Sequence, residues 1–178
     1  MRYIIFLSLF FNAFIAGASP LDDARKLFFR IEEGKDIARQ LQRITEDGLK
    51  AENYVLAGYH AVATANLATH TLMPVSRYNF FTEGRNMIEQ AIRSAPNDAE
   101  LRFLRLTIQV GTPAFLHYNQ HIATDRDFVL QYLETQFQKS DNANRFWMQV
   151  LLYLRDRSRP DEISRNRINK LLEKNYTT

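Results

Sequence analysis

The sequence predicts an all-α protein, and three observations indicate this fold class. The 178-residue chain contains only 6 glycines and 5 prolines, which is few for a protein built from many short strands and turns. Apolar residues recur at spacings of three and four along most of the chain, which is the period of an amphipathic helix. No segment alternates apolar and polar residues over the length of a strand, and no Asn-Gly turn marks a β-hairpin.

The first 18 residues have the pattern of a secretory signal peptide. Arg2 precedes an apolar run that only Ser8 and Asn12 interrupt, and the run ends at the small residues Ala16-Gly17-Ala18. The run has about 13 apolar residues, whereas a membrane-spanning helix needs about 20. We therefore expect cleavage after Ala18, export to the periplasm or beyond, and a mature domain of residues 19–178. Retention of the segment as an anchor is the alternative.

Helical segments follow one another from Ser19 to the end of the chain. Ser19-Pro20 supplies an N-cap and a proline in the first turn, and Gly34 ends this first helix. Pro74 and Pro96 separate later helices, and Asp125 is expected to cap one of them. The further helices are expected over residues 37–44, 51–72, 77–95, 98–110, 113–122, 126–137, 144–157 and 162–174. These eight or nine helices, with no low-complexity linker between them, predict a single domain.

One segment has the spacing of a helical repeat. Gly84, Ile88, Ala91 and Pro96 follow one another at intervals of 4, 3 and 5 residues, which resembles the second helix of a tetratricopeptide repeat. Small residues at two of these positions let helices cross closely, and the proline ends the helix. Gly58 resembles the small position of the preceding helix, but it lies 38 residues before Pro96, against about 24 in a standard repeat. We therefore predict an irregular tetratricopeptide-like (TPR-like) array of antiparallel helical hairpins.

A more specific pattern lies in residues 100–129, ELRFLRLTIQVGTPAFLHYNQHIATDRDFV. It resembles the signature of a family of uncharacterised, exported bacterial proteins with a tetratricopeptide-like fold, and the upstream YNFFTEGRNMIEQAI also fits. The resemblance implies a fold and an exported location, and it implies no activity. The family usually has a glycine where this chain has His117. The residues that match the pattern are Glu100, Arg102, Phe103, Leu104, Arg105, Gln109, Pro113, Phe115, Leu116, Tyr118 and Asp125.

A polar stripe runs along the helix expected over residues 98–110. Asp98, Arg102, Arg105 and Gln109 fall at i, i+4, i+7 and i+11 and so share one face of an otherwise apolar helix. In a binding role, the two guanidinium groups would hold a carboxylate or phosphate, with Gln109 beside them and Tyr118 as a flanking contact. In a structural role, the arginines would join neighbouring helices through ion pairs. The carboxylates considered for that second role are Asp98, Glu89 and Asp125.

Few residues indicate catalysis. The chain has no cysteine, which excludes disulfides, thiolate nucleophiles and cysteine-ligated metals. It has neither a Gly-x-Ser-x-Gly motif nor a glycine-rich phosphate loop, so we expect no enzyme and no cofactor. His117 and His121 have the i, i+4 spacing of metal ligands on a helix, but the glutamate of the zinc-protease motif is missing. A metal-dependent enzyme is therefore the least favoured alternative.

The charge of the chain indicates which partners to expect. A net charge of +3 is too small to predict nucleic-acid binding. The segment RDRSRPDEISRNRINKLLEK mixes both signs, which favours a solvated helix over a lipid-binding or nucleic-acid-binding one. Tyr78, Phe80 and Phe81 are interpreted as packing residues. The mature chain has no second long apolar run, so we expect no integral membrane segment.

Together these observations predict an exported, soluble binding or scaffold module that recognises a peptide or protein partner. The alternative is a structural subunit of a cell-envelope assembly, which would use an exposed apolar face. The expected ligand-binding residues are Arg102, Arg105, Gln109 and Tyr118.

Overall fold

The computed structural model describes residues 19–48, 50–139 and 145–176. Over these ranges the chain is helical and contains no strand, which confirms the all-α prediction. The predicted signal peptide, residues 1–18, lies outside the described residues. The helices are α1 (Pro20–Phe28), η1 (Ile31–Glu33), α2 (Lys35–Ile44), α3 (Tyr54–Leu67), η2 (Ala68–His70), α4 (Pro74–Ser94), α5 (Ala99–Gly111), η3 (Ala114–Leu116), α6 (Ile122–Lys139), α7 (Arg145–Arg157) and α8 (Glu162–Tyr176), where η marks a 3-10 helix.

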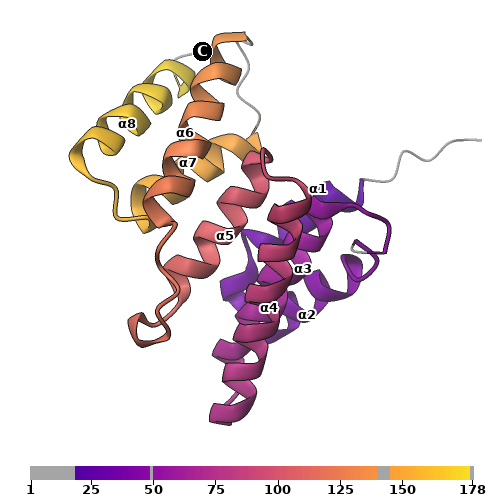
Figure 1. The fold of residues 1–178 in the computed structure, drawn as a ribbon. Coiled ribbons are helices and arrows are strands. Elements are labelled where there is room, and N and C mark those ends of the chain that lie inside the picture. The colour runs from indigo at the N-terminus through magenta and orange to yellow at the C-terminus, as the bar shows by residue number, and fades with distance from the viewer. Residues whose placement is uncertain (1–18, 49, 140–144, 177–178) are drawn as a thin grey trace, which may run out of the picture.

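The helices pack as successive pairs. α1 contacts α2, α3 contacts α4, α5 contacts α6 and α7 contacts α8. In addition, α2 packs against α3, and α5 packs against α3 and α4. Helices α1 to α4 form one half of the molecule and α6 to α8 the other, with α5 between them (Figure 1). α5 is therefore the helix that joins the two halves.

Local capping residues explain where several helices begin. The side chains of Ser19, Asn53 and Asp98 each accept a hydrogen bond from a backbone N–H in the first turn of α1, α3 and α5, which is the N-cap arrangement. Pro20 and Pro74 each lie in a first helical turn, where a missing N–H costs nothing.

Small residues allow α3 and α4 to pack closely. A Cβ atom on Gly84 would lie 2.6 Å from the backbone oxygen of Ala61 and 2.7 Å from the Cβ atom of Ala65. Ala57 and Ala61 are themselves fully buried. Only glycine fits at position 84, because a side chain there would collide with the backbone of α3.

The central position of α5 is visible in its burial. Leu101, Phe103, Leu104 and Leu106 are all fully buried, and the ring of Phe103 lies edge-on to that of Phe28 in α1, with centroids 5.6 Å apart. Because these apolar residues cover most of the surface of α5, three of its polar residues, Glu100, Arg105 and Gln109, are buried as well.

The structure differs from the sequence-based boundaries at several helix ends. α1 ends at Phe28, and η1 lies between it and Gly34. α3 ends at Leu67, and α4 already begins at Pro74, since a proline is accommodated in the first turn of a helix. The helix expected over 113–122 is absent. Only Ala114–Leu116 is a 3-10 helix, which ends at His117 in a left-handed conformation with φ of 49°. α6 then begins at Ile122, so Asp125 lies inside its first turn and does not cap it.

None of the described helices has both the length and the apolar character needed to cross a membrane.

Candidate functional site

The stripe on α5 leads to a buried ion-pair network. The Nε and Nη2 atoms of Arg105 each donate to a different carboxylate oxygen of Asp125, both at 2.7 Å. Its Nη1 atom donates to Glu89 in α4 at 3.1 Å. Arg105 is 4% exposed and Asp125 is fully buried. Burial lowers the pKa of Arg105, but its hydrogen bonds and charge interactions with Asp125 and then Glu89 outweigh this and raise the pKa overall.

Two further side chains complete this network. The hydroxyl of Tyr118 donates to Glu89 at 2.6 Å, and burial, reinforced by Glu89, raises the pKa of that phenol. Arg102 approaches Asp125 at 3.4 Å and donates from Nη2 to the carbonyl of Pro96 at 2.9 Å. The two arginines and two carboxylates balance in charge, so the network joins α4, α5 and α6 without leaving a net charge buried.

These contacts place Arg102 and Arg105 in the structural role that the sequence left open. Each of the three guanidinium nitrogens of Arg105 donates to a carboxylate of the protein, and the group is shielded from solvent. Of the carboxylates considered from the sequence, Glu89 and Asp125 are the partners, whereas Asp98 caps α5 through the N–H of Leu101. An external anion would have to displace Asp125 to reach Arg105.

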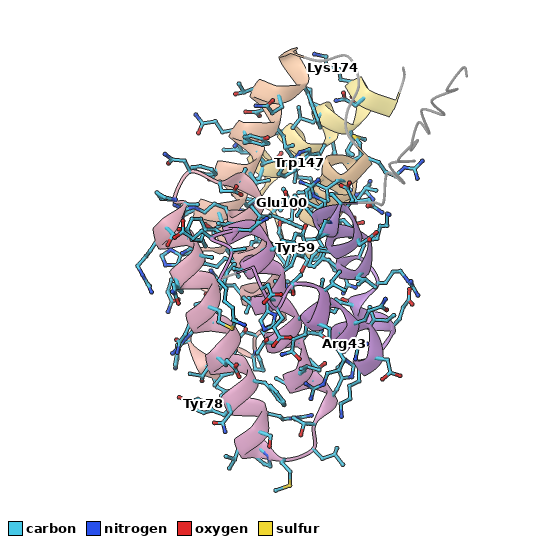
Figure 2. All side chains as sticks on the ribbon, turned by 90° about the vertical axis from the view of Figure 1, so that its right-hand side faces the viewer. Arg43, Tyr59, Tyr78, Glu100, Trp147 and Lys174 are labelled. Atoms are coloured by element: carbon cyan, nitrogen blue, oxygen red, sulfur yellow. The ribbon has the colours of Figure 1, made fainter. Side chains whose placement is uncertain are left out.

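A second buried network, which the sequence did not reveal, lies on another side of α5. Glu100 is 5% exposed and accepts hydrogen bonds from the guanidinium of Arg25 in α1 and from the hydroxyl of Tyr59 in α3, the latter at 2.6 Å. Tyr59 and Glu100 lie inside the helical body (Figure 2). Burial, and then Glu100, raises the pKa of Tyr59. The guanidinium of Arg25 also stacks 4.4 Å above the ring of Phe146 in α7. This network ties α1, α3, α5 and α7 together.

The other two predicted site residues, Gln109 and Tyr118, line a cleft at the C-terminal end of α5. Its volume is about 320 Å³, and it lies between the end of α5, the segment before α6 and the turn from α7 to α8. We call it the Gln109 cleft. Its lining residues are Gln109, Val110, Thr112, Pro113, Ala114, Tyr118, Asn119, Ile122, Arg157, Ser158 and Arg159.

Gln109 has one satisfied and one unsatisfied polar atom. It is 1% exposed, and its Oε1 atom accepts a hydrogen bond from the backbone N–H of His121 at 3.0 Å. Its Nε2 atom is buried and has no hydrogen-bond partner among the described residues. A buried amide donor without an acceptor is unfavourable. Gln109 is also one of the residues that line the cleft.

Two arginines lie at the same cleft. Arg157 is already bound to Glu32 at 2.8 Å, but no described carboxylate forms an ion pair with Arg159. Arg159 is exposed and has a left-handed backbone with φ of 48°, which is uncommon for a residue other than glycine. The sequence interpretation missed both arginines, because nothing in their spacing connects residues 157–159 with Gln109.

The histidine pair does not have the arrangement assumed from the sequence. His117 ends η3 and His121 precedes α6, so no helix places the two rings on one face. Over the described residues, no group of three or more His, Asp or Glu side chains is arranged so that it could share a metal ion.

Comparison with known proteins adds no relative to this picture. No protein-family model, curated protein or solved structure matches the chain.

Proposed function

We propose that this chain is an exported, TPR-like binding module that holds an acidic group of a peptide or protein partner in the Gln109 cleft. The observation that carries the proposal is the buried Nε2 donor of Gln109, which lines the cleft and lacks an acceptor. The pairwise packing of successive helices supports the TPR-like arrangement. The signal-like pattern of residues 1–18 supports export.

The chemistry of the cleft favours a carboxylate as the bound group. An amide N–H donates to a carboxylate oxygen, and a guanidinium group without an internal partner supplies the opposite charge. Gln109 and Arg159 together provide both groups. This keeps the anionic specificity predicted from the sequence, but assigns it to Arg159 in place of Arg102 and Arg105.

The size of the cleft restricts what can enter. A volume of about 320 Å³ lies at the lower end of the range for small-molecule sites, roughly 300–1,000 Å³. It accommodates one acidic side chain or one chain terminus better than a large cofactor. Val110, Pro113 and Ile122 contribute apolar surface to the lining, against which the stem of such a group would pack.

The first experiment measures the side-chain amide resonances of Gln109 by nuclear magnetic resonance. The probe is trialanine with a free carboxylate, titrated into nitrogen-15-labelled chain beginning at Ser19, and the control probe is the same peptide with an amidated C-terminus. We expect the free carboxylate to shift the Gln109 amide resonances and the amidated peptide to leave them unchanged. Equal shifts with both peptides, or none with either, would contradict carboxylate recognition in the cleft.

Matched variants then test the residues in a pull-down from cell-envelope extract. Gln109→Leu and Arg159→Glu should each lose a partner that the unaltered chain retains. Arg165→Glu is the control, because Arg165 is an exposed arginine on α8 that does not line the cleft. If Arg165→Glu loses the partner to the same extent, the effect is one of net charge and the cleft is not the binding site.

A further inference from the structure

The connection between α3 and α4 exposes a cluster of large apolar side chains. Leu72 is 93% exposed, Met73 65%, Val75 69% and Tyr78 56%. We call these four residues the hairpin tip. They account for most of the large apolar side chains that the described part of the chain leaves exposed. The interpretation of Tyr78 as a packing residue was therefore wrong, whereas its neighbour Phe81 is buried as expected.

The hairpin tip is held in place by local bonds and projects from the molecule. Pro74 lies in the first turn of α4, the N–H of Arg77 donates to the carbonyl of Met73 at 3.0 Å, and its Nε atom donates to the carbonyl of Thr71 at 2.7 Å. The α3–α4 connection lies at the free lower end of the ribbon, and Tyr78 lies towards that end (Figures 1 and 2). The apolar side chains therefore point outward from a defined structure.

The segment that carries the hairpin tip has charge of one sign, and the next charged residue of α4 is Glu83. From Asn53 to Thr82 the sequence contains no aspartate or glutamate, and Arg77 is its only arginine or lysine. Two further arginines stack on the next aromatic residues of α4, Arg39 on Phe80 at 5.9 Å and Arg85 on Phe81 at 5.7 Å from the ring centroid. An apolar tip that carries Arg77 and has no acidic residue in its own segment is complementary to an anionic, apolar surface.

The small size of the hairpin tip argues against a protein occupant. A stable protein interface uses about 20–30 residues on each side, whereas the hairpin tip offers four. Peripheral attachment to a bilayer requires fewer residues, because a few inserted apolar side chains act together with an electrostatic attraction to anionic lipids. Tyrosine is also favoured at the level of the lipid headgroups.

We propose that the hairpin tip docks on the surface of an anionic lipid bilayer. Leu72, Met73 and Val75 insert among the headgroups, Tyr78 lies at the interface, and Arg77 contacts lipid phosphates. The hairpin tip and the Gln109 cleft share no residue, so this inference does not depend on the proposed peptide binding.

Flotation with lipid vesicles tests the inference. The chain beginning at Ser19 contains every described helix and lacks the apolar residues of the signal-like segment, which would themselves bind lipid. It is mixed with vesicles of equal parts phosphatidylglycerol and phosphatidylcholine, or of phosphatidylcholine alone. We expect binding to the anionic vesicles that weakens at high salt. The double variant Leu72→Ser, Val75→Ser should reduce the partition coefficient by about tenfold or more, since two inserted side chains are lost.

A matched control separates a specific docking surface from general stickiness. Ile163 on α8 is 75% exposed and lies outside the hairpin tip, so Ile163→Ser should bind vesicles as the unaltered chain does. Circular dichroism confirms that each variant remains helical. The proposal is overturned if the unaltered chain does not float with anionic vesicles, or if the double variant floats equally well. It is also overturned if sedimentation shows a dimer that the double variant abolishes, because the tip would then bind a second copy of the chain.

Discussion

Replacing Asp125 with alanine is the sharpest test of how the two halves of the molecule are joined. The Asp125 carboxylate is fully buried and accepts hydrogen bonds from Arg105 at 2.7 and 2.7 Å and from Arg102 at 3.4 Å. Without it, Arg105 keeps only its bond to Glu89, at 3.1 Å. Arg105 is 4% exposed, so water cannot replace the lost carboxylate without rearrangement of α5 or α6.

The expected cost follows from the burial of this pair. Removing one partner of a buried ion pair typically destabilises a protein by about 3–5 kcal/mol, and a domain of this kind is stable by about 5–15 kcal/mol in total. Asp125→Ala should therefore lose a large part of the free energy of unfolding. The assay is urea unfolding of the chain beginning at Ser19, followed by far-ultraviolet circular dichroism.

Two further variants make the result interpretable. Asp127→Ala removes a carboxylate on the same helix whose side chain is 57% exposed, and it should cost no more than about 1 kcal/mol. Adding Arg105→Met to Asp125→Ala should recover much of the loss, because no charge remains buried. A loss below about 1 kcal/mol for Asp125→Ala would refute the reasoning, since the carboxylate would then not stabilise Arg105 inside the protein.

Two other perturbations have defined outcomes. Gly84→Ala should destabilise the protein by about 1–3 kcal/mol in thermal unfolding, because its Cβ atom would lie 2.6 Å from the oxygen of Ala61; an unchanged midpoint would mean that α3 and α4 separate without cost. Burial raises the pKa of Tyr59 and of Tyr118 above the ordinary value of 10.0. The two neutral phenols therefore contribute their full stabilisation below about pH 10. This contribution is lost as the pH rises towards their folded-state pKa values. The free energy of unfolding should therefore fall above pH 10, with a smaller slope in Tyr59→Phe, and a pH-independent value up to pH 11 would contradict these pKa shifts.

The helices could be predicted because their signals are local. The cap at Ser19 and the stop at Pro96 each depend on a few neighbouring residues, and the structure confirms both. The segment 113–122 failed because apolar spacing alone does not produce a helix. His117 adopts a left-handed conformation there, and the chain turns before α6 begins.

From the sequence, the ion pairs of Arg102 and Arg105 could be predicted only as one of two possible roles, with three candidate carboxylates. The stripe on α5 showed that its arginines need partners, and Glu89 and Asp125 were among those considered. Which carboxylate is within reach depends on how α4 and α6 pack against α5, and no local pattern contains that information. Asp125 was expected as a helix cap because it precedes an apolar run, but α6 begins three residues earlier.

The burial of α5 also explains why the polar stripe changes role along its length. Glu100 and Arg105 are five residues apart, which places them about 140° apart around the helix axis. They therefore bind partners on different helices, and the contacts of Glu100 and of Arg105 together fix the orientation of α5 about its own axis. At Gln109 the helix is about to end, and the neighbouring helices no longer supply a partner for every polar atom. The unsatisfied donor consequently occurs at this last position of the stripe, beside the cleft in which we propose that an external group binds.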